Sequence, residues 1–263
     1  MTNDVVLSSV EGNVGIISIN RADKFNCLSM GVHQGLQAAL KKHEDNSDVR
    51  VILLCSEGKH FCTGADLGEV HTKIESKDEE ALRFFIELGH KTCTGFEQSS
   101  LPVIGAIQGF CLAGGIEISL GCDILFAADD AVFGDQHANY GLIPGWGGSQ
   151  RLPRVIGFRR ALDLMFSGRR LKAEEAEKWG MVSYLAPAAD LRSKALDYCH
   201  TLASKSAEGL AMMKSLAYNG VDLPLQASLE LEVNEAVQGL QSDDVAEGLA
   251  AFGERREPAF KPR

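Results

Sequence analysis

The stretch GFCLAGGIEISLG, residues 109–121, places two adjacent glycines between a short apolar run and a helix-like segment. The first backbone N–H groups of a helix have no partner inside the helix and carry the positive end of its dipole. The amide of Gly114 is therefore a candidate to stabilise negative charge on a ligand oxygen. Glu117 follows in an otherwise apolar segment. Burying a carboxylate there is costly, which suggests that Glu117 has a functional role.

Short apolar runs on both sides of this stretch predict strands. Residues 49–56 and 102–109 are β-rich and end in polar or glycine residues, which is typical of buried strands, and residues 123–127 form another such run. Nearer the N-terminus, residues 4–20 form two apolar runs around the turn-like sequence Glu11-Gly12-Asn13. This pattern predicts a β-hairpin.

Helices are predicted between and after these strands. Ser29 is a candidate N-cap for a helix whose apolar residues recur at helical spacing through Leu40. From about residue 158 onward the pattern is mostly helical, with helix ends at Gly168 and Gly180 and one short strand candidate at 181–186. The order of elements predicts an α/β fold with a helical C-terminal part.

The composition limits the classes of function. The chain has 263 residues, of which 45% are hydrophobic and 24% charged, and this fits one soluble domain with a sizeable core. Its net charge is −10 and its basic residues are scattered, so no nucleic acid or membrane is expected as a partner. The N-terminus shows no signal-peptide pattern, and no apolar run is long enough to span a membrane. We therefore expect a cytoplasmic protein.

The cysteines and the absent motifs narrow the chemistry. Seven cysteines without a CxxC pair predict buried, reduced thiols rather than disulfides or a zinc site. For Cys62, packing is favoured over a nucleophilic role, because nothing in the sequence indicates a lowered thiol pKa. The dinucleotide-binding, Walker A, nucleophile-elbow and H-E-x-x-H patterns are missing. We expect neither a metal nor a redox cofactor.

Two further segments are candidates for chemistry. In HFCTGADL, residues 60–67, Gly64 allows a sharp turn that leaves the amide of Ala65 free to face a ligand, although the segment taken alone is better explained as an ordinary turn. In FGDQHANYGLIPGWGGSQR, residues 133–151, His137 precedes a glycine-rich loop and another helix start.

These segments, with INRADKFNCLS near the N-terminus and EGLAAFGERREPAFKPR at the C-terminus, resemble the enoyl-CoA hydratase/isomerase (crotonase) superfamily in order and spacing. The resemblance covers nearly the whole chain. It implies an α/β fold of the crotonase (ClpP-like) type, with repeated ββα units and an acyl-CoA site in residues 1–200. It also implies a helical region, residues 201–263, for trimerisation and closure of the CoA pocket. Homotrimers or dimers of trimers are the expected assembly.

The chemistry shared by the family implies roles for individual residues. An acyl-CoA thioester acquires enolate character, and the amides of Ala65 and Gly114 would stabilise the charge on its oxygen. Gly145 stands where hydratases tend to have a glycine whose amide contacts water. No cofactor is expected beyond the coenzyme A of the substrate. The residues expected to bind substrate or CoA, the last two from a neighbouring subunit, are Lys24, Phe25, Cys27, Leu28, Ala65, Asp66, Leu67, Trp146, Phe260 and Lys261. Within this set, Asp66 is expected mainly to fix its loop, and for Trp146 plain packing is an equal alternative.

The chain departs from the family pattern at one position. Hydratases of the family carry two glutamates 20 positions apart. Glu117 matches the first, whereas the second position holds His137. Imidazole titrates near neutrality, so His137 can exchange the α-proton while Glu117 activates water. The alternative is a histidine that only hydrogen-bonds Glu117 or Asp135 and shapes the pocket.

Three functions follow from this departure. The favoured one is reversible hydration of a 2-trans-enoyl-CoA to a 3-hydroxyacyl-CoA, with Glu117 and His137 as the catalytic pair. The second is double-bond isomerisation, for which one base suffices. The third is an acyl-CoA-binding homologue without turnover, since the second glutamate is missing.

Overall fold

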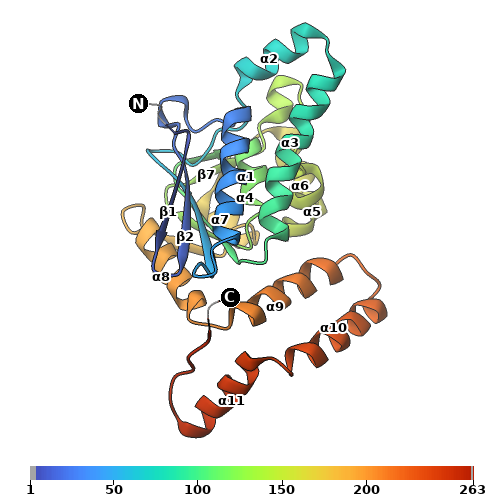
Figure 1. The fold of residues 1–263 in the computed structure, drawn as a ribbon. Helices are drawn as coiled ribbons and strands as arrows, with labels where there is room; N and C mark the ends of the chain where they lie inside the picture. Colours follow the sequence, from blue (N-terminus) through green and yellow to red (C-terminus); the bar gives the residue numbers. More distant parts are fainter. Residues whose placement is uncertain (1–3, 262) are drawn as a thin grey trace.

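The computed structural model describes residues 4–261 and 263, and its central feature is a mostly parallel sheet (Figure 1). Among these residues, six strands form this sheet in the order β1-β2-β3-β4-β6-β9. β1 pairs antiparallel with β2, and the remaining pairs are parallel. The strands are β1 (Val6–Glu11), β2 (Val14–Ile19), β3 (Val51–Ser56), β4 (Val103–Ile107), β6 (Ile124–Ala128) and β9 (Tyr184–Ala186). The predicted hairpin and the four other predicted strands of this sheet are confirmed.

A second, three-stranded sheet lies beside the first and carries part of the site. It has the order β5-β7-β8, with β5 (Phe110–Leu112) parallel to β7 (Val132–Gly134) and β8 (Leu171–Lys172) antiparallel to β7. The sequence did not predict β7 or β8, because runs of two or three residues are too short to show a β-period. This sheet aligns the glycine-rich segment after β5 with the segment that contains His137.

Helices cover both faces of the large sheet (Figure 1). Ser29 caps α1, where its side chain accepts a hydrogen bond from the amide of Val32, as predicted. Gly168 and Gly180 adopt positive φ after helical segments, as expected for helix ends. The longer helices are α1 (Met30–Glu44), α2 (Leu67–Ser76), α3 (Glu79–Gln98), α5 (Gly148–Ile156), α6 (Phe158–Ser167), α8 (Leu191–Ala203), α9 (Ala207–Gly220), α10 (Leu225–Gly239) and α11 (Asp243–Glu254). The short ones are η1 (Ala22–Lys24), α4 (Gly114–Ser119), η2 (His137–Tyr140) and α7 (Ala173–Lys178).

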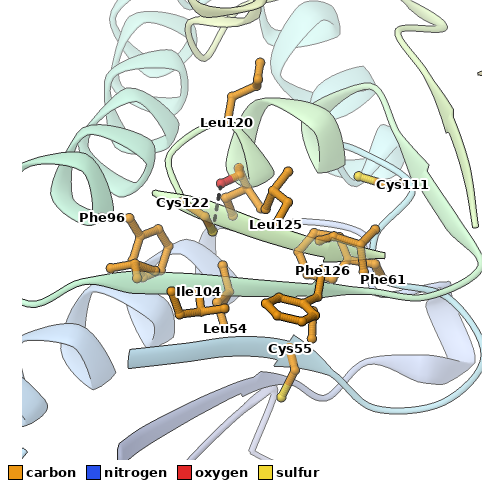
Figure 2. Close-up of a cluster of buried hydrophobic side chains, with 14 of the residues drawn as sticks. Leu54, Cys55, Phe61, Phe96, Ile104, Cys111, Leu120, Cys122, Leu125 and Phe126 are labelled. Atoms are coloured by element: carbon orange, nitrogen blue, oxygen red, sulfur yellow. Dashed lines mark hydrogen bonds between the residues drawn. The ribbon is translucent and has the colours of Figure 1, made fainter. Parts of the chain in front are cut away.

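Part of the hydrophobic core lies between the large sheet and the helices α3 and α4. Figure 2 shows Leu54 and Ile104 from the sheet packed with Phe96 of α3 and with Leu125. Each of these side chains is almost fully buried. The core holds α4 firmly against the sheet, and α4 carries both Gly114 and Glu117.

The C-terminal helices differ in how closely they pack against the rest of the chain. α8 packs against β3 and β4, and α9 contacts α3 and pairs with Asp123 through Lys214, whereas α10 and α11 extend away from the body (Figure 1). The division into residues 1–200 and 201–263 stays a prediction. In the part of the chain that the structure describes, none of the helices combines the length and apolarity needed to cross a bilayer.

Candidate active site

Two loop segments are held side by side by backbone hydrogen bonds. The amide of Cys62 donates to the carbonyl of Phe110 at 3.0 Å, and the amide of Leu112 donates to the carbonyl of Cys62 at 2.9 Å. The segment that ends in Ala65 therefore runs beside the segment that ends in Gly114. A Cβ on Gly64, whose φ is +101°, would lie 2.9 Å from the Cβ of Ala113, so only glycine fits this approach.

The amides of Ala65 and Gly114 have no hydrogen-bond partner within the described residues. Gly114 is the first residue of α4, where an amide has no acceptor inside the helix. Ala65 pairs with Leu28 through a bridge in which the neighbouring amides, not its own, donate. Two unused N–H donors on adjacent segments are the arrangement that stabilises a developing oxyanion.

Ala113 holds the turn before α4 in an unfavourable backbone conformation. Its φ is +49° and its ψ is −118°, a region that L-residues rarely adopt. The amide of Ala113 donates to the carbonyl of Gly134 in β7 at 2.8 Å, which fixes the turn. Strain of this kind costs on the order of 1–3 kcal/mol and persists only where the surroundings enforce it.

Glu117 is buried behind this turn with one oxygen fully engaged. The residue is 1% exposed, and its Oε1 accepts hydrogen bonds from the amides of Trp146 at 2.7 Å and Gly148 at 2.9 Å. Oε2 lies 3.7 Å from Nε2 of His137. The carboxylate is therefore oriented by backbone donors on one side, and its other oxygen is available for a proton.

His137 lies between two carboxylates. Its Nδ1 is 2.9 Å from Oδ1 of Asp135, and its Nε2 faces Glu117. The side chain of His137 is 11% exposed, and those of Asp135 and Glu117 are 2% exposed. The imidazole thus has the better access to solvent and to a ligand.

The surroundings shift the pKa values of both members of the pair upward. Burial raises the pKa of Glu117, and the two backbone donors and the charge of His137 offset this only in part. Burial alone would lower the pKa of His137, but the hydrogen bond to Asp135 and the charges of Asp135 and Glu117 outweigh it, so the pKa is raised. Glu117 is a stronger base than an exposed glutamate, and His137 holds its proton more tightly than a free histidine.

A cavity of about 350 Å³ opens beside these groups. Its walls combine apolar side chains with basic ones and hold no carboxylate among the described residues, although the chain as a whole is acidic. An anionic, partly apolar ligand fits such walls. The residues that line it are Lys24, Cys27, Thr63, Ala65, Leu67, Leu112, Ala113, Gln136, His137, Tyr140, Leu142 and Arg170.

The structure brings several predicted contact residues to this cavity. Lys24, Cys27, Ala65 and Leu67 line it together with His137. These residues come from three separate stretches of sequence, and the cavity is their meeting point. Their roles toward a ligand stay predictions.

Other predicted contact residues lie elsewhere or serve the loop. Leu28 is fully buried in the core, and Phe25 is 55% exposed. Asp66 forms an ion pair with Arg21 at 2.8 Å and caps α2, in agreement with its expected loop-fixing role. Phe260 and Lys261 do not line the cavity of their own protomer. Their backbone carbonyls accept hydrogen bonds from Arg50, and the Lys261 side chain pairs with Asp243.

Trp146 and Gly145 lie next to Glu117. Trp146 is 3% exposed, and its ring contacts those of His33 and Phe85 edge-on. Gly145 is half-buried, and its amide has no hydrogen-bond partner among the described residues. Trp146 is packed in the core and does not line the cavity, so its role toward the acyl group stays a prediction, and the amide of Gly145 is free to bind water.

Sequence reasoning missed several contributors to the site. Tyr140, Leu142 and Arg170 line the cavity, but no local pattern marks them as ligand-facing. The backbone amides that hold Glu117 were also missed, because main-chain donors leave no trace in residue type. Cys62 is fully buried, and burial raises the pKa of its thiol to about 12, which disfavours the thiolate at neutral pH and agrees with a packing role.

Comparison with known proteins agrees with this fold. The family model for enoyl-CoA hydratase/isomerase matches residues 9–263. A probable enoyl-CoA hydratase of Mycobacterium bovis is 35% identical over 263 residues, which is 100% of both chains. A short-chain-enoyl-CoA hydratase of Clostridium acetobutylicum is 31% identical and covers 99% of both chains. A crystal structure of an enoyl-CoA hydratase from Bacillus anthracis superposes with a TM-score of 0.93 at 35% identity, covering 98% of this chain and 100% of that one.

The fold and the two free amides define an α/β protein of the crotonase type. The chain belongs to the enoyl-CoA hydratase/isomerase family. The predicted fold class and the predicted family are both confirmed.

Proposed function

We propose that this protein is an enoyl-CoA hydratase, which adds water reversibly to a 2-trans-enoyl-CoA to give a 3-hydroxyacyl-CoA. One observation carries the proposal: Oε2 of Glu117 and Nε2 of His137 face each other at 3.7 Å beside the unused amides of Ala65 and Gly114. The names of the related hydratases agree with it. No cofactor is needed, because coenzyme A is part of the substrate.

In this mechanism the thioester oxygen is bound by the amides of Ala65 and Gly114. Glu117 removes a proton from water as the water oxygen bonds to C3, and negative charge develops on the thioester oxygen. His137 then gives its Nε2 proton to C2. The enolate electron pair forms the new C–H bond, and the N–H electrons stay on the ring. Loss of one oxyanion donor typically raises such a barrier by ~3 kcal/mol.

The pair also restores itself after turnover. Addition of water leaves Glu117 protonated and His137 neutral. The two groups are separated by 3.7 Å, so a small side-chain movement or one bridging water passes the proton back. A second glutamate is therefore not required for the cycle to close.

The same family offers a second reaction for this site. Double-bond isomerisation moves a proton between C2 and C4 and needs a single acid–base group. The better access of His137 compared with Glu117 favours this alternative, because one accessible imidazole is enough for it.

The decisive experiment is incubation with crotonyl-CoA in heavy water, followed by mass spectrometry, for the wild type, Glu117→Gln and His137→Gln. Deuterated 3-hydroxybutyryl-CoA from the wild type, reduced about 10²- to 10⁴-fold in each variant, is expected for a general acid–base pair. Deuterium exchange without hydration would contradict the hydratase assignment and support the isomerase assignment. Binding without hydration or exchange, on this and longer enoyl-CoAs, would leave a non-catalytic acyl-CoA-binding protein.

We further propose that the protein works as a homotrimer or a dimer of trimers, with residues 201–263 in the subunit contacts. The support is an apolar stripe at i, i+4 spacing on α10, formed by Leu225, Leu229, Val233 and Val237, whose side chains are 45–74% exposed in the protomer. In such an assembly Phe260 and Lys261 would contact the CoA of a neighbouring subunit. We place the enzyme in the cytoplasm, since its seven cysteines are free thiols.

A further inference from the structure

Asp135 is a buried carboxylate to which the proposed reaction assigns no step. It follows β7 and is 1% exposed. Among the described residues, His137 is the one cationic group within ion-pair distance of it. A buried carboxylate without a cationic partner is unfavourable, so the ion pair with His137 is what stabilises Asp135 in this position.

The contact with Asp135 fixes His137 at two points. Oδ1 of Asp135 accepts from Nδ1 of the ring at 2.9 Å and more weakly from the backbone amide of His137 at 3.4 Å. The intervening Gln136 has a positive φ of 55°, which curls the chain so that the ring lies over the carboxylate. Because Nδ1 is engaged, Nε2 is the ring atom that points toward Glu117.

Other charged groups near the imidazole come from several elements. Glu117 faces it from α4 and Asp135 from the end of β7. Lys24 at the end of η1, Arg170 before β8 and the thiol of Cys27 line the same cavity. None of these three is within ion-pair distance of the ring in the part of the chain that is described. The two carboxylates therefore dominate the field at His137.

We propose that Asp135 is a positioning residue that keeps His137 protonated, with Nδ1–H bound and Nε2–H directed at the substrate, so that the imidazolium acts as the acid toward C2. The inference rests on the proposed function, because C2 protonation is its step. When Nε2 gives up its proton, the neutral ring keeps the hydrogen on Nδ1, where Asp135 still accepts it. The charge of Asp135 also favours the return of the proton from Glu117.

The same reasoning predicts that the effect of Asp135 on activity changes from favourable to unfavourable when His137 is replaced by glutamate. In the wild type, Asp135 stabilises a cation. In a His137→Glu background, Asp135 would lie beside two carboxylates and would oppose the ionised form of both. A residue that serves only the loop would be harmful to remove in either background, since its backbone contact does not depend on the ring at position 137.

The test is a double-mutant cycle of Asp135→Asn and His137→Glu, with hydration of crotonyl-CoA measured across pH. Asp135→Asn alone is expected to lower kcat roughly 10- to 100-fold, less than loss of the general acid itself, and to move the alkaline limb to lower pH. In the His137→Glu background, Asp135→Asn is expected to leave kcat unchanged or to raise it. Equal losses in both backgrounds, without a shift of the pH profile, would overturn the proposal.

A spectroscopic readout separates this inference from the proposed function. Ring ¹⁵N shifts of His137 should show titration at lower pH in Asp135→Asn than in the wild type, whether or not the protein hydrates any substrate. Unchanged titration would overturn the role of Asp135, whereas an inactive wild type would overturn only the hydratase. The matched control is Asp123→Asn, a half-buried carboxylate paired with Lys214, which should leave the titration of His137 unchanged.

Discussion

The indole of Trp146 rests directly against Gly114, the residue that supplies one of the two proposed oxyanion donors. A Cβ on Gly114 would lie 2.4 Å from Cζ3 of Trp146, so no larger residue fits there without movement. The amide of Trp146 also donates to Glu117. One residue thus braces the oxyanion hole with its side chain and orients the base with its backbone, and a shift in either group is transmitted to the other.

The first prediction concerns Gly114→Ala. The added methyl group meets the indole of Trp146 and must displace either the ring or the start of α4, so the Gly114 amide loses its alignment. We expect kcat to fall about 100-fold, corresponding to loss of one donor worth ~3 kcal/mol. The control is Gly253→Ala in α11, where nothing lies within 4 Å of the new Cβ. Activity within a few-fold of wild type would show that the Gly114 amide is not an oxyanion donor.

The second prediction separates stability from activity at Ala113. Glycine accepts the φ of +49° without strain, so Ala113→Gly removes a cost on the order of 1–3 kcal/mol while adding about 0.4–1 kcal/mol of unfolded-chain entropy. We expect a higher Tm together with a lower kcat, because a more mobile turn holds the Gly114 amide less firmly. Calorimetry and crotonyl-CoA kinetics measure the two effects. A lower Tm would mean that the turn is unstrained.

Most of the large sheet was predictable because β2, β3, β4 and β6 are apolar runs of five or six residues. Val14–Ile19 and Val51–Ser56 are buried along their whole length, so their sequences are almost purely apolar. The strands of the small sheet are two or three residues long, and only their pairing makes them strands. Their positions therefore depended on contacts between distant segments.

Within the site, the sequence identified the chemically active side chains but not the contacts between them. Glu117 was identifiable as an isolated acid in an apolar helix, and His137 as a departure from a family pattern. The sequence left open whether His137 contacts Glu117 or Asp135. The structure shows a hydrogen bond to Asp135 and a close approach to Glu117. The amides that bind Glu117 and the cavity wall at Arg170 arise from tertiary packing, which carries no local signal.

The third prediction concerns the C-terminal arm. If α10 forms subunit contacts through its exposed apolar stripe, then Leu229→Glu together with Val233→Glu should dissociate the assembly, since buried unpaired carboxylates are costly. Sedimentation velocity should give trimers or hexamers for the wild type and smaller species for the variant. Glu230→Ala, one position along the same helix, is the control and should leave the mass unchanged. A monomeric wild type would refute the proposed assembly.

The fourth prediction is the pH dependence of kcat/KM for hydration. The base must be ionised, so activity should rise as pH passes upward through the raised pKa of Glu117. The acid must be protonated, so activity should fall as pH passes upward through the raised pKa of His137. The profile should be bell-shaped, and His137→Gln should remove its alkaline limb. A limb that persists in this variant would belong to another group.

The raised pKa of His137 also makes the stability of the fold depend on pH, because the histidine has its ordinary pKa in the unfolded chain. A histidine whose pKa is higher in the folded than in the unfolded chain stabilises the fold fully below the ordinary value of about 6.5. This contribution is lost as pH rises through the higher folded value. The free energy of unfolding of the wild type, measured against that of His137→Gln, should therefore decline from slightly acidic to mildly alkaline pH. A difference that stays constant over this range would mean that Asp135 and Glu117 do not favour the imidazolium.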